Sequence, residues 1–161
     1  MNKFIDNSNF AIRLVKGKIA ETIFEQMFRE TKNFTILGFG YEKVIPELVQ
    51  QGYKESEKTL EIIKTAPDFA VISKTQKEVK LVEVKYMKTL DYDFIYKDAN
   101  RMKNSWNPSY LFVATQLGFY FGDVETVLKN NGDIPKLDER FVSKELQDKF
   151  CKILIDFEAD N

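Results

Sequence analysis

Residues 66–88 constrain the fold more than any other part of the sequence, because they read as two apolar strands joined by a tight turn. The register of a hairpin follows from its turn. With the turn centred on Thr75 and Gln76, Asp68 lies directly opposite Glu83. Directly opposed residues of paired strands have β-carbons about 4.5–5.5 Å apart. The hairpin therefore predicts that two carboxylates converge at its open end.

The two carboxylates share one face of the predicted hairpin with a lysine. Successive side chains of a strand point to opposite faces, so Lys85 lies on the same side as Glu83 and Asp68. The other members of this face are apolar: Ala70, Ile72, Val79 and Leu81. Taken alone, the second strand could equally be amphipathic with its charges in water. Asp68 reaches the same end from a separate strand, which favours a divalent-metal hydrolytic site.

The residue inventory narrows the chemistry of such a site. The sequence has no histidine, which excludes histidine-based triads and most zinc sites. Its single cysteine, Cys151, cannot form an internal disulfide, and we expect a buried structural thiol in a reducing compartment. A metal site must then be built from carboxylate and carbonyl oxygens, which suit Mg²⁺, Mn²⁺ or Ca²⁺.

The residue types around the motif match the needs of metal-assisted hydrolysis. Carboxylates on adjacent strands can hold Mg²⁺ through oxygens about 2.1 Å from the ion. The carbonyl of Val84, between Glu83 and Lys85, is placed to be a further ligand. A bound metal polarises a phosphoryl oxygen and activates water. Lys85 can orient that water or neutralise charge that develops on the phosphorane.

Composition sets limits on partners and location. The chain has 161 residues and is 43% hydrophobic, which predicts one globular domain over residues 1–161. Its net charge is −1, so a nucleic acid would have to be held by a local basic patch. No signal sequence and no apolar run of about 18 residues is visible, which predicts a soluble, cytoplasmic protein that makes no contact with membranes.

The order of the expected elements indicates a layered domain. Residues 1–9 are polar and are expected to fray. The expected elements are a helix over 10–30, a strand over 34–42, a mixed insertion at 43–65, the hairpin over 67–87, a helix from Asp91 or Asp93 to 104, strands at 109–116 and 117–121, a helix capped by Asp123 that runs to 129, and a helix over 138–155. This order predicts an α/β or α+β fold in which helices cover a mixed central sheet.

Two motifs resemble a known family. Pro67-Asp68, followed by Glu83-Val84-Lys85, resembles the signature of the PD-(D/E)XK nuclease superfamily, which has the restriction-endonuclease-like fold. Gly17-x-x-x-Glu21 looks like the first-helix signature of its archaeal Holliday-junction-resolvase-like members. The resemblance covers about residues 10–116. The insertion at 43–65 and a C-terminal helical extension at 123–155 lie outside the shared core.

This resemblance implies an α/β fold with a mixed central sheet, and it implies roles for four residues. Asp68 and Glu83 would be metal ligands, and Lys85 would be the catalytic lysine. Glu21 would be an additional first-helix acid that binds a metal directly or through water. An ordinary glutamate at the edge of the apolar stripe is the alternative for Glu21.

Several further residues are weaker candidates. Lys16 falls inside the apolar stripe of the first helix, where it either extends its ammonium to water or contacts a phosphate. Lys88, Arg101 and Lys103 could line a nucleic-acid groove, or they could simply be solvated. Two polar residues at strand ends are expected to be mostly structural: Glu42 and Gln116.

The sequence thus predicts a nuclease dependent on Mg²⁺ or Mn²⁺, with a DNA endonuclease of restriction, repair, recombination or mobile-element defence as the favoured activity. One alternative is a catalytically inactive nuclease-fold module that binds nucleic acid or assembles with a partner protein. Another is a nuclease subunit whose specificity comes from a partner. A homodimer is also expected to be possible, because two strands must be cut.

Overall fold

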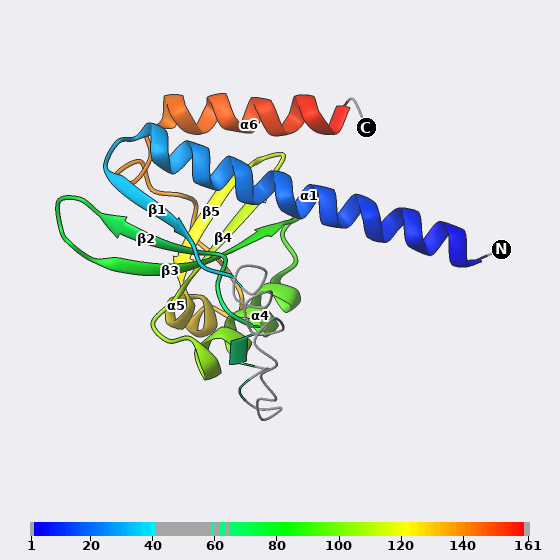
Figure 1. Cartoon of the computed structure of the whole chain (residues 1–161), viewed down its shortest axis with the longest axis horizontal. Coiled ribbons are helices and arrows are strands. Elements are labelled where there is room, and N and C mark those ends of the chain that lie inside the picture. Colours follow the sequence, from blue (N-terminus) through cyan, green and yellow to red (C-terminus); the bar gives the residue numbers. More distant parts are fainter. Residues whose placement is uncertain (1, 41–58, 60–61, 64, 160–161) are drawn as a thin grey trace, which may run out of the picture.

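A five-stranded mixed sheet forms the centre of the molecule, and helices cover both of its faces (Figure 1). The computed structural model describes residues 2–40, 59, 62–63 and 65–159. The elements are α1 (Asn2–Glu30), β1 (Phe34–Gly38), β2 (Phe69–Ser73), β3 (Val79–Tyr86), α4 (Tyr92–Ser105), β4 (Tyr110–Thr115), β5 (Gly118–Asp123), α5 (Val124–Lys129) and α6 (Lys144–Ala159).

The strand order is β1-β2-β3-β4-β5, with β3 in the middle. Only the pairing of β3 with β4 is parallel, whereas the other three pairings are antiparallel. A parallel pair needs a crossover connection, and α4 supplies it. The predicted α/β class with a mixed central sheet flanked by helices is confirmed, and it is consistent with a restriction-endonuclease-like fold.

The register of the central hairpin is the predicted one. Phe69 pairs with Val82, and Ile72 pairs with Val79. The turn is closed by the N–H of Ser73, which donates to the carbonyl of Glu78 at 2.9 Å. Continuing this register by one pair beyond Phe69 brings Asp68 opposite Glu83.

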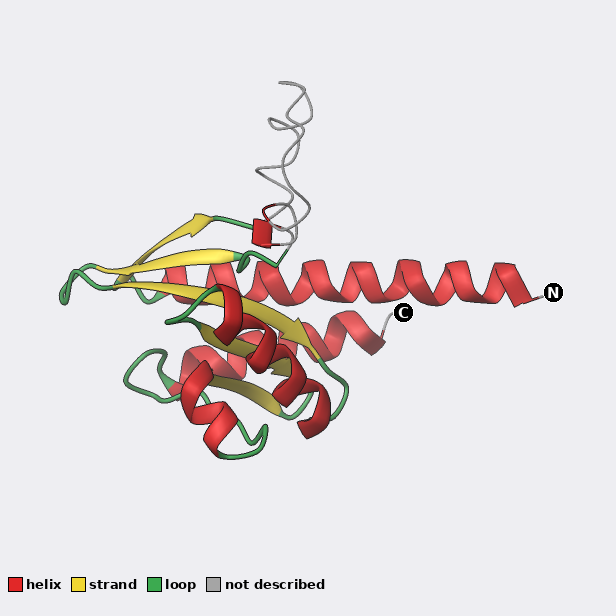
Figure 2. Ribbon diagram, turned by 90° about the horizontal axis from the view of Figure 1, so that it is seen from below, coloured by secondary structure: helices red, strands yellow, loops and turns green. Residues whose placement is uncertain are grey.

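The face of the sheet under α1 and α6 carries the larger apolar core (Figure 2). The predicted apolar stripe of α1 is buried there in its C-terminal part, with Phe24 fully buried, whereas its first members, Ile12 and Val15, are each 52% exposed. The Phe24 ring lies 4.5 Å from that of Phe28 and 4.9 Å from that of Phe112 on β4. From α6, Phe150 and Leu154 complete this core. These contacts fix α1 against the middle of the sheet.

The opposite face packs against α4 and α5 (Figure 2). Both helices begin at the predicted caps: the Asp91 carboxylate accepts from the N–H of Phe94 at 3.0 Å, and that of Asp123 from Thr126 at 2.9 Å. Gly132 follows α5 with a φ of +91°, and a β-carbon there would lie 2.1 Å from the carbonyl oxygen of Tyr92. A side chain at position 132 would therefore separate α5 from α4.

Three predicted boundaries were wrong. The first helix begins at Asn2, so residues 2–9 continue it instead of fraying. The last helix spans Lys144–Ala159 and not 138–155. Asp138 instead forms a turn, because its carboxylate accepts from the N–H of Arg140 at 2.8 Å. The strand expected over 34–42 ends at Gly38, and its last two residues lie outside the described residues, as does most of the insertion at 43–65.

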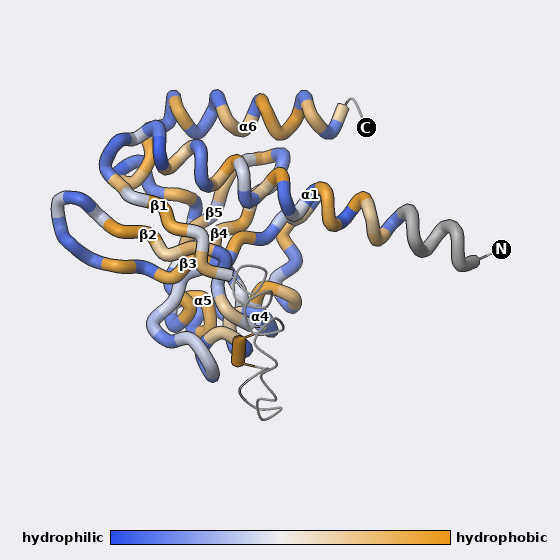
Figure 3. The backbone as a smooth tube through the Cα atoms, in the orientation of Figure 1, coloured by the Kyte–Doolittle hydropathy of each residue, from blue (hydrophilic) through white to orange (hydrophobic). Residues whose placement is uncertain are grey.

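The N-terminal half of α1 projects past the edge of the sheet and beyond the end of α6, as Figures 1 and 2 agree. Apolar residues continue along this overhang (Figure 3). Phe10 is 63% exposed and Leu14 is 55% exposed. In the part of the chain that the structure describes, no helix is both long and apolar enough to cross a membrane.

Candidate active site

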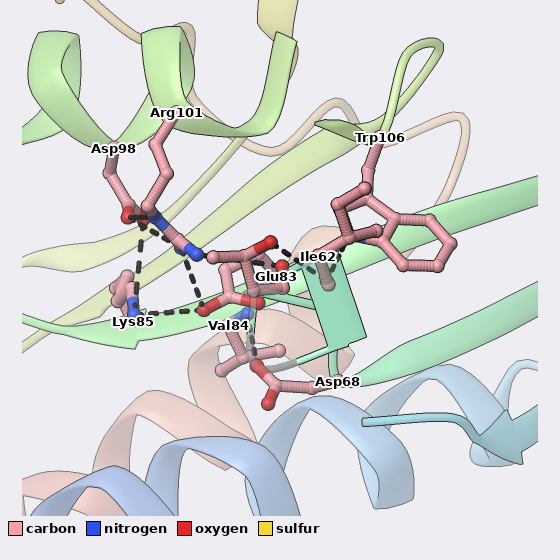
Figure 4. A network of polar contacts seen from close by, with 9 residues as sticks. Ile62, Asp68, Glu83, Val84, Lys85, Asp98, Arg101 and Trp106 are labelled. Atoms are coloured by element: carbon pink, nitrogen blue, oxygen red, sulfur yellow. Dashed lines mark hydrogen bonds and ion pairs between the residues drawn. The ribbon is translucent and has the colours of Figure 1, made fainter. Parts of the chain in front are cut away.

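The two predicted carboxylates lie at the open end of the central hairpin (Figure 4). Asp68 precedes β2, and its Oδ2 accepts a hydrogen bond of 2.8 Å from the backbone N–H of Val84 on β3. Pro67, buried just before Asp68, has no N–H to continue the strand ladder. The Asp68 side chain therefore takes over the pairing with β3, and this fixes its carboxylate beside Glu83.

Glu83 and Lys85 form a close ion pair on the α4 side of β3. The Lys85 Nζ lies 2.8 Å from Glu83 Oε1. The Glu83 side chain is only 9% exposed, and its second oxygen, Oε2, is buried without a hydrogen-bond partner among the described residues. A buried carboxylate oxygen without a donor is unfavourable, and a cation is one way to satisfy it.

Two residues of α4 extend this ion pair into a network that we did not predict. Arg101 donates to Asp98 Oδ1 from Nη2 at 2.7 Å and from Nε at 3.1 Å. The same Nη2 lies 3.6 Å from Glu83 Oε1, and Lys85 Nζ lies 3.9 Å from Asp98 Oδ2. Two buried acids thus share two cations, and the pairs join α4 to β3 (Figure 4).

The sequence holds a signal for Asp98 that the hairpin-centred prediction did not use. The buried residues of α4 recur at helical spacing as Ile95, Asp98, Ala99 and Met102. A carboxylate inside an apolar stripe is expected to face a buried partner. Arg101 was predicted as a nucleic-acid contact. In the structure its guanidinium donates hydrogen bonds to Asp98 and, at 3.4 Å, to the carbonyl of Thr65.

The end of α4 also holds the segment that leads into Asp68. The indole N–H of Trp106 donates to the carbonyl of Ile62 at 3.1 Å. The Trp106 ring packs edge-on against that of Phe39, with centroids 5.4 Å apart. Together with the Arg101 contact to Thr65, these bonds attach both ends of residues 62–65 to α4 and its C-cap.

The electrostatics of the site follow from burial. Burial, then the charge of Glu83, raises the pKa of Asp68 to about 7, with the Val84 N–H acting in the opposite direction and the charge of Glu21 adding to the rise. Burial also raises the pKa of Glu83, against the opposing effect of Lys85. Burial lowers the pKa of Lys85, but Glu83 and Asp98 outweigh it, so the pKa lies above its ordinary value. Lys85 is therefore a cation at neutral pH.

A pocket of about 610 Å³ joins α1 to the ends of β2 and β3. The lining residues are Asn9, Ile12, Arg13, Lys16, Gly17, Glu21, Asp68, Glu83, Val84, Lys85 and Tyr86. Six predicted residues therefore share one pocket, among them Glu21 and Lys16 from the first helix. Glu21 lies within an ion-pair distance of Lys18, at 3.2 Å. Asn9 and Arg13 line the same pocket but were not predicted as site residues, and Tyr86, expected beside a nucleic-acid groove, lines it too.

The remaining predicted residues lie elsewhere. Lys88 and Lys103 are exposed and do not line the pocket. Gln116 contacts the side chain of Glu158 on α6, and its carbonyl accepts from the thiol of Cys151 at 3.4 Å. These contacts agree with the structural role expected for Gln116, and Cys151 is half-buried. Glu42 lies outside the described residues.

The donor set fits a hard divalent cation in its chemistry. Asp68 and Glu83 supply carboxylates, and the unpartnered Glu83 Oε2 supplies a ready ligand atom. The carbonyl and N–H of a strand residue point to the same side, so the carbonyl of Val84 also faces Asp68. Within the described ranges, no three or more His, Cys, Asp or Glu side chains are grouped closely enough to hold a metal unaided. Asp68, Glu83 and the Val84 carbonyl are the set at the ends of β2 and β3, and the Glu21 carboxylate lines the same pocket from α1.

No protein-family model matches the sequence, and no curated protein is detectably similar to it. The function has to be inferred from the residues of the pocket.

Proposed function

We propose that the protein is a metal-dependent nuclease of the PD-(D/E)XK type that hydrolyses phosphodiester bonds, with DNA as the favoured substrate. The observation that carries this proposal is the pairing of Asp68 and Glu83 beside a cationic Lys85 in a pocket open to solvent. Buried acids with raised pKa values cluster at functional sites. The unpartnered oxygen of Glu83 supports the proposal, because a bound cation would satisfy it.

The chemistry assigns a task to each group. Asp68, Glu83 and the carbonyl of Val84 would hold Mg²⁺ or Mn²⁺, and Glu21 would bind through water or directly. The bound ion supplies Lewis-acid activation of the phosphoryl group and of water. Lys85 remains protonated beside Glu83, so it neutralises negative charge on the phosphoryl oxygens as it develops. The hydrogen bond from the N–H of Val84 fixes the orientation of the Asp68 carboxylate at the proposed metal position.

Cleavage assays on conservative variants test this proposal. Asp68→Asn and Glu83→Gln keep the side-chain shape but remove a ligand charge. Each is expected to lower the rate of cleavage by at least about 10²–10³-fold in Mg²⁺. Duplex, branched and single-stranded DNA, with RNA of the same sequence, should be assayed in parallel. Lys152→Gln, at an exposed position of α6, is the matched control. Undiminished cleavage by either site variant would contradict the assignment.

A second candidate function is a catalytically inactive module of the same fold that binds nucleic acid or assembles with a partner. One observation favours it: Glu83 Oε1 is already balanced by Lys85 at 2.8 Å and by Arg101 at 3.6 Å, without any added cation. Calorimetric titration with Mn²⁺ separates the two functions. Binding that Glu83→Gln abolishes supports the nuclease, whereas no binding at millimolar metal with DNA present supports the module.

The proposal includes a partner or a second copy, because two strands must be cut and the net charge of −1 gives little general attraction to nucleic acid. The exposed apolar residues of the α1 overhang, such as Phe10 and Leu14, are available for such a contact. Measurement of the mass in solution distinguishes a dimer from a monomer that needs a partner subunit.

The single cysteine supports a reducing compartment, the cytoplasm, as the location of the protein.

A further inference from the structure

Gly17 lies in the middle of α1 without a packing reason. A β-carbon added there would meet no other atom within 4 Å. Glycine is about the least favourable residue for a helix interior after proline. A glycine within a helix is usually explained by another element that approaches its backbone closely. No described residue packs against Gly17 in this way. Gly17 instead lines the candidate active-site pocket, so the space above it is open to a molecule from outside.

The same face of α1 is positively charged between Asn9 and Gly17. Asn9, Arg13, Lys16 and Gly17 recur at helical spacing and line the pocket together. Residues 9–17 contain two cations and no acid, although the whole chain has a net charge of −1. Within residues 9–21 the only acid is Glu21, at the active-site end. The charge therefore changes from negative at the proposed metal site to positive over residues 9–17.

Both cations are placed for an external anion. The Lys16 ammonium lies 5.3 Å from the centroid of the Tyr86 ring, which directs it toward the end of β3 and the pocket. Arg13 is exposed, and it makes no hydrogen bond or ion pair with any described residue. A helix rises 1.5 Å per residue, so Arg13 lies roughly 12 Å along the axis from Glu21. A strand advances about 3.4 Å per phosphate, which gives Lys16 and Arg13 reach over phosphates about two to four nucleotides from the site.

We propose that this face of α1 is the seat of the substrate strand: the sugar-phosphate backbone passes over Gly17, and Lys16 and Arg13 pair with phosphates near the one that is cut. The inference rests on the proposed nuclease function and specifies which surface holds the substrate. The bare backbone at Gly17 lets the strand approach the helix closely, while the two cations set its direction toward Asp68 and Glu83. Phosphate contacts of this kind fix position without reading sequence.

Two substitutions at Gly17 separate this role from a structural one. Gly17→Ala and Gly17→Leu both improve helix propensity, and Gly17→Ala is expected to raise the melting temperature by about 2–4 °C. Both should nevertheless weaken binding of a fluorescein-labelled DNA, measured by anisotropy in EDTA, with Gly17→Leu weaker than Gly17→Ala. Gln26→Ala, on the exposed side of α1, is the control that improves the helix without entering the pocket. Gly17 variants that are more stable and bind as well as the wild type would overturn the proposal.

The double variant Arg13→Gln with Lys16→Gln tests the charge. Affinity for the labelled DNA should fall about tenfold or more at low salt, and the slope of log affinity against log salt should decrease by about 1.4–1.8. The control is Lys129→Gln with Lys152→Gln, which removes two exposed charges outside the pocket and should leave the slope unchanged. An unchanged slope in the Arg13 and Lys16 variant would overturn the proposed seat.

The failures of the two proposals are distinguishable. If Glu83→Gln abolishes cleavage while the Gly17 and Arg13/Lys16 variants bind and cut like the wild type, the nuclease stands and the strand seat is wrong. A wild-type chain that neither binds nor cuts DNA or RNA overturns both. Metal-free binding that depends on Arg13, Lys16 and Gly17 supports the seat whether or not the chain is catalytically active.

Discussion

The two faces of β3 differ in character although they belong to one strand. Val82 and Val84 point toward α1 and are buried in an apolar core. Glu83 and Lys85 point toward α4 and meet Asp98 and Arg101. Apolar burial stabilises the fold at about 25 cal/mol per Å². Buried charges cost desolvation and recover it only through good pairing. The comparison teaches that β3 contributes apolar burial on its α1 side, whereas on its α4 side two of its residues add a buried charge network beside a second apolar core.

The largest expected effect lies on the apolar face. Phe112→Ala removes a fully buried ring that packs against Phe24 and Phe28. The free energy of unfolding should fall by about 3–5 kcal/mol, because the ring's contacts are lost and a cavity is left. Urea denaturation followed by circular dichroism measures this. Leu117→Ala, at a position that is 84% exposed, is the control and should change stability by less than about 0.5 kcal/mol. A loss below about 1 kcal/mol for Phe112→Ala would show that this core is not closely packed.

Next in size is Lys85→Met on the charged face. It leaves the buried Glu83 with only the longer contact to Arg101, so stability at pH 7 should fall by about 2–3 kcal/mol. The double variant with Glu83→Gln should recover most of this loss, because no unpaired carboxylate remains. A double-mutant cycle of urea denaturation curves measures the coupling. Additive losses would show that the pair at 2.8 Å is energetically unimportant.

The pH dependence of Asp68 is expected to be somewhat smaller. The folded pKa of about 7 lies above the ordinary value of 3.8 for aspartate, so the folded state holds the proton more tightly than the unfolded state. This contribution to stability is complete below about pH 4 and is lost as pH rises toward 7. Relative to Asp68→Asn, the wild type in EDTA should lose about 2 kcal/mol between pH 5 and pH 7. Parallel pH profiles for the two proteins would mean that Asp68 is not buried as an acid.

The smallest effect is expected for Asp98→Asn, which keeps one acceptor for Arg101 but removes its negative charge. Loss of charge assistance should lower stability by about 1 kcal/mol. Asp98→Ala, which leaves Arg101 without that acceptor, should lower it by more. Thermal unfolding of the two variants measures the difference. Equal effects would indicate that the charge, and not the hydrogen-bond geometry, holds Arg101.

The parts of the site that could be predicted from sequence depend on local rules. Strand alternation and the turn at Thr75 and Gln76 determine which side chains face one another, so the register of Asp68 and Glu83 could be derived. The cap at Asp91 is likewise local, because a side chain bonds to an N–H three residues along the chain. These interactions do not depend on how the layers pack.

The contacts of Asp98 and Arg101 could not be derived in the same way. They depend on how α4 is rotated over β3, and apolar packing across the whole face sets that rotation. The extension of α1 to Asn2 was missed because residues 2–9 lack a continuous apolar stripe, while a helix already fixed by its C-terminal half can continue without one. Propensity also placed the last helix too early, because the Asp138 turn competes with the helix.

The attachment of Ile62 and Thr65 to α4 and its C-cap has a consequence for how the chain can vary. The carbonyls of both residues are held by Trp106 and Arg101, only a few positions before Asp68 enters the hairpin. Before the insertion, the N–H groups of Phe39 and Gly40 donate to the carbonyl of Asp68 at 2.8 and 3.3 Å. Asp68 is thus held by residues on both sides of positions 41–61. Loop closure becomes costlier only slowly with length. Residues can therefore be added or removed between positions 41 and 61, or a tag or a second domain placed there, and we expect the geometry of Asp68 and Glu83 to stay the same.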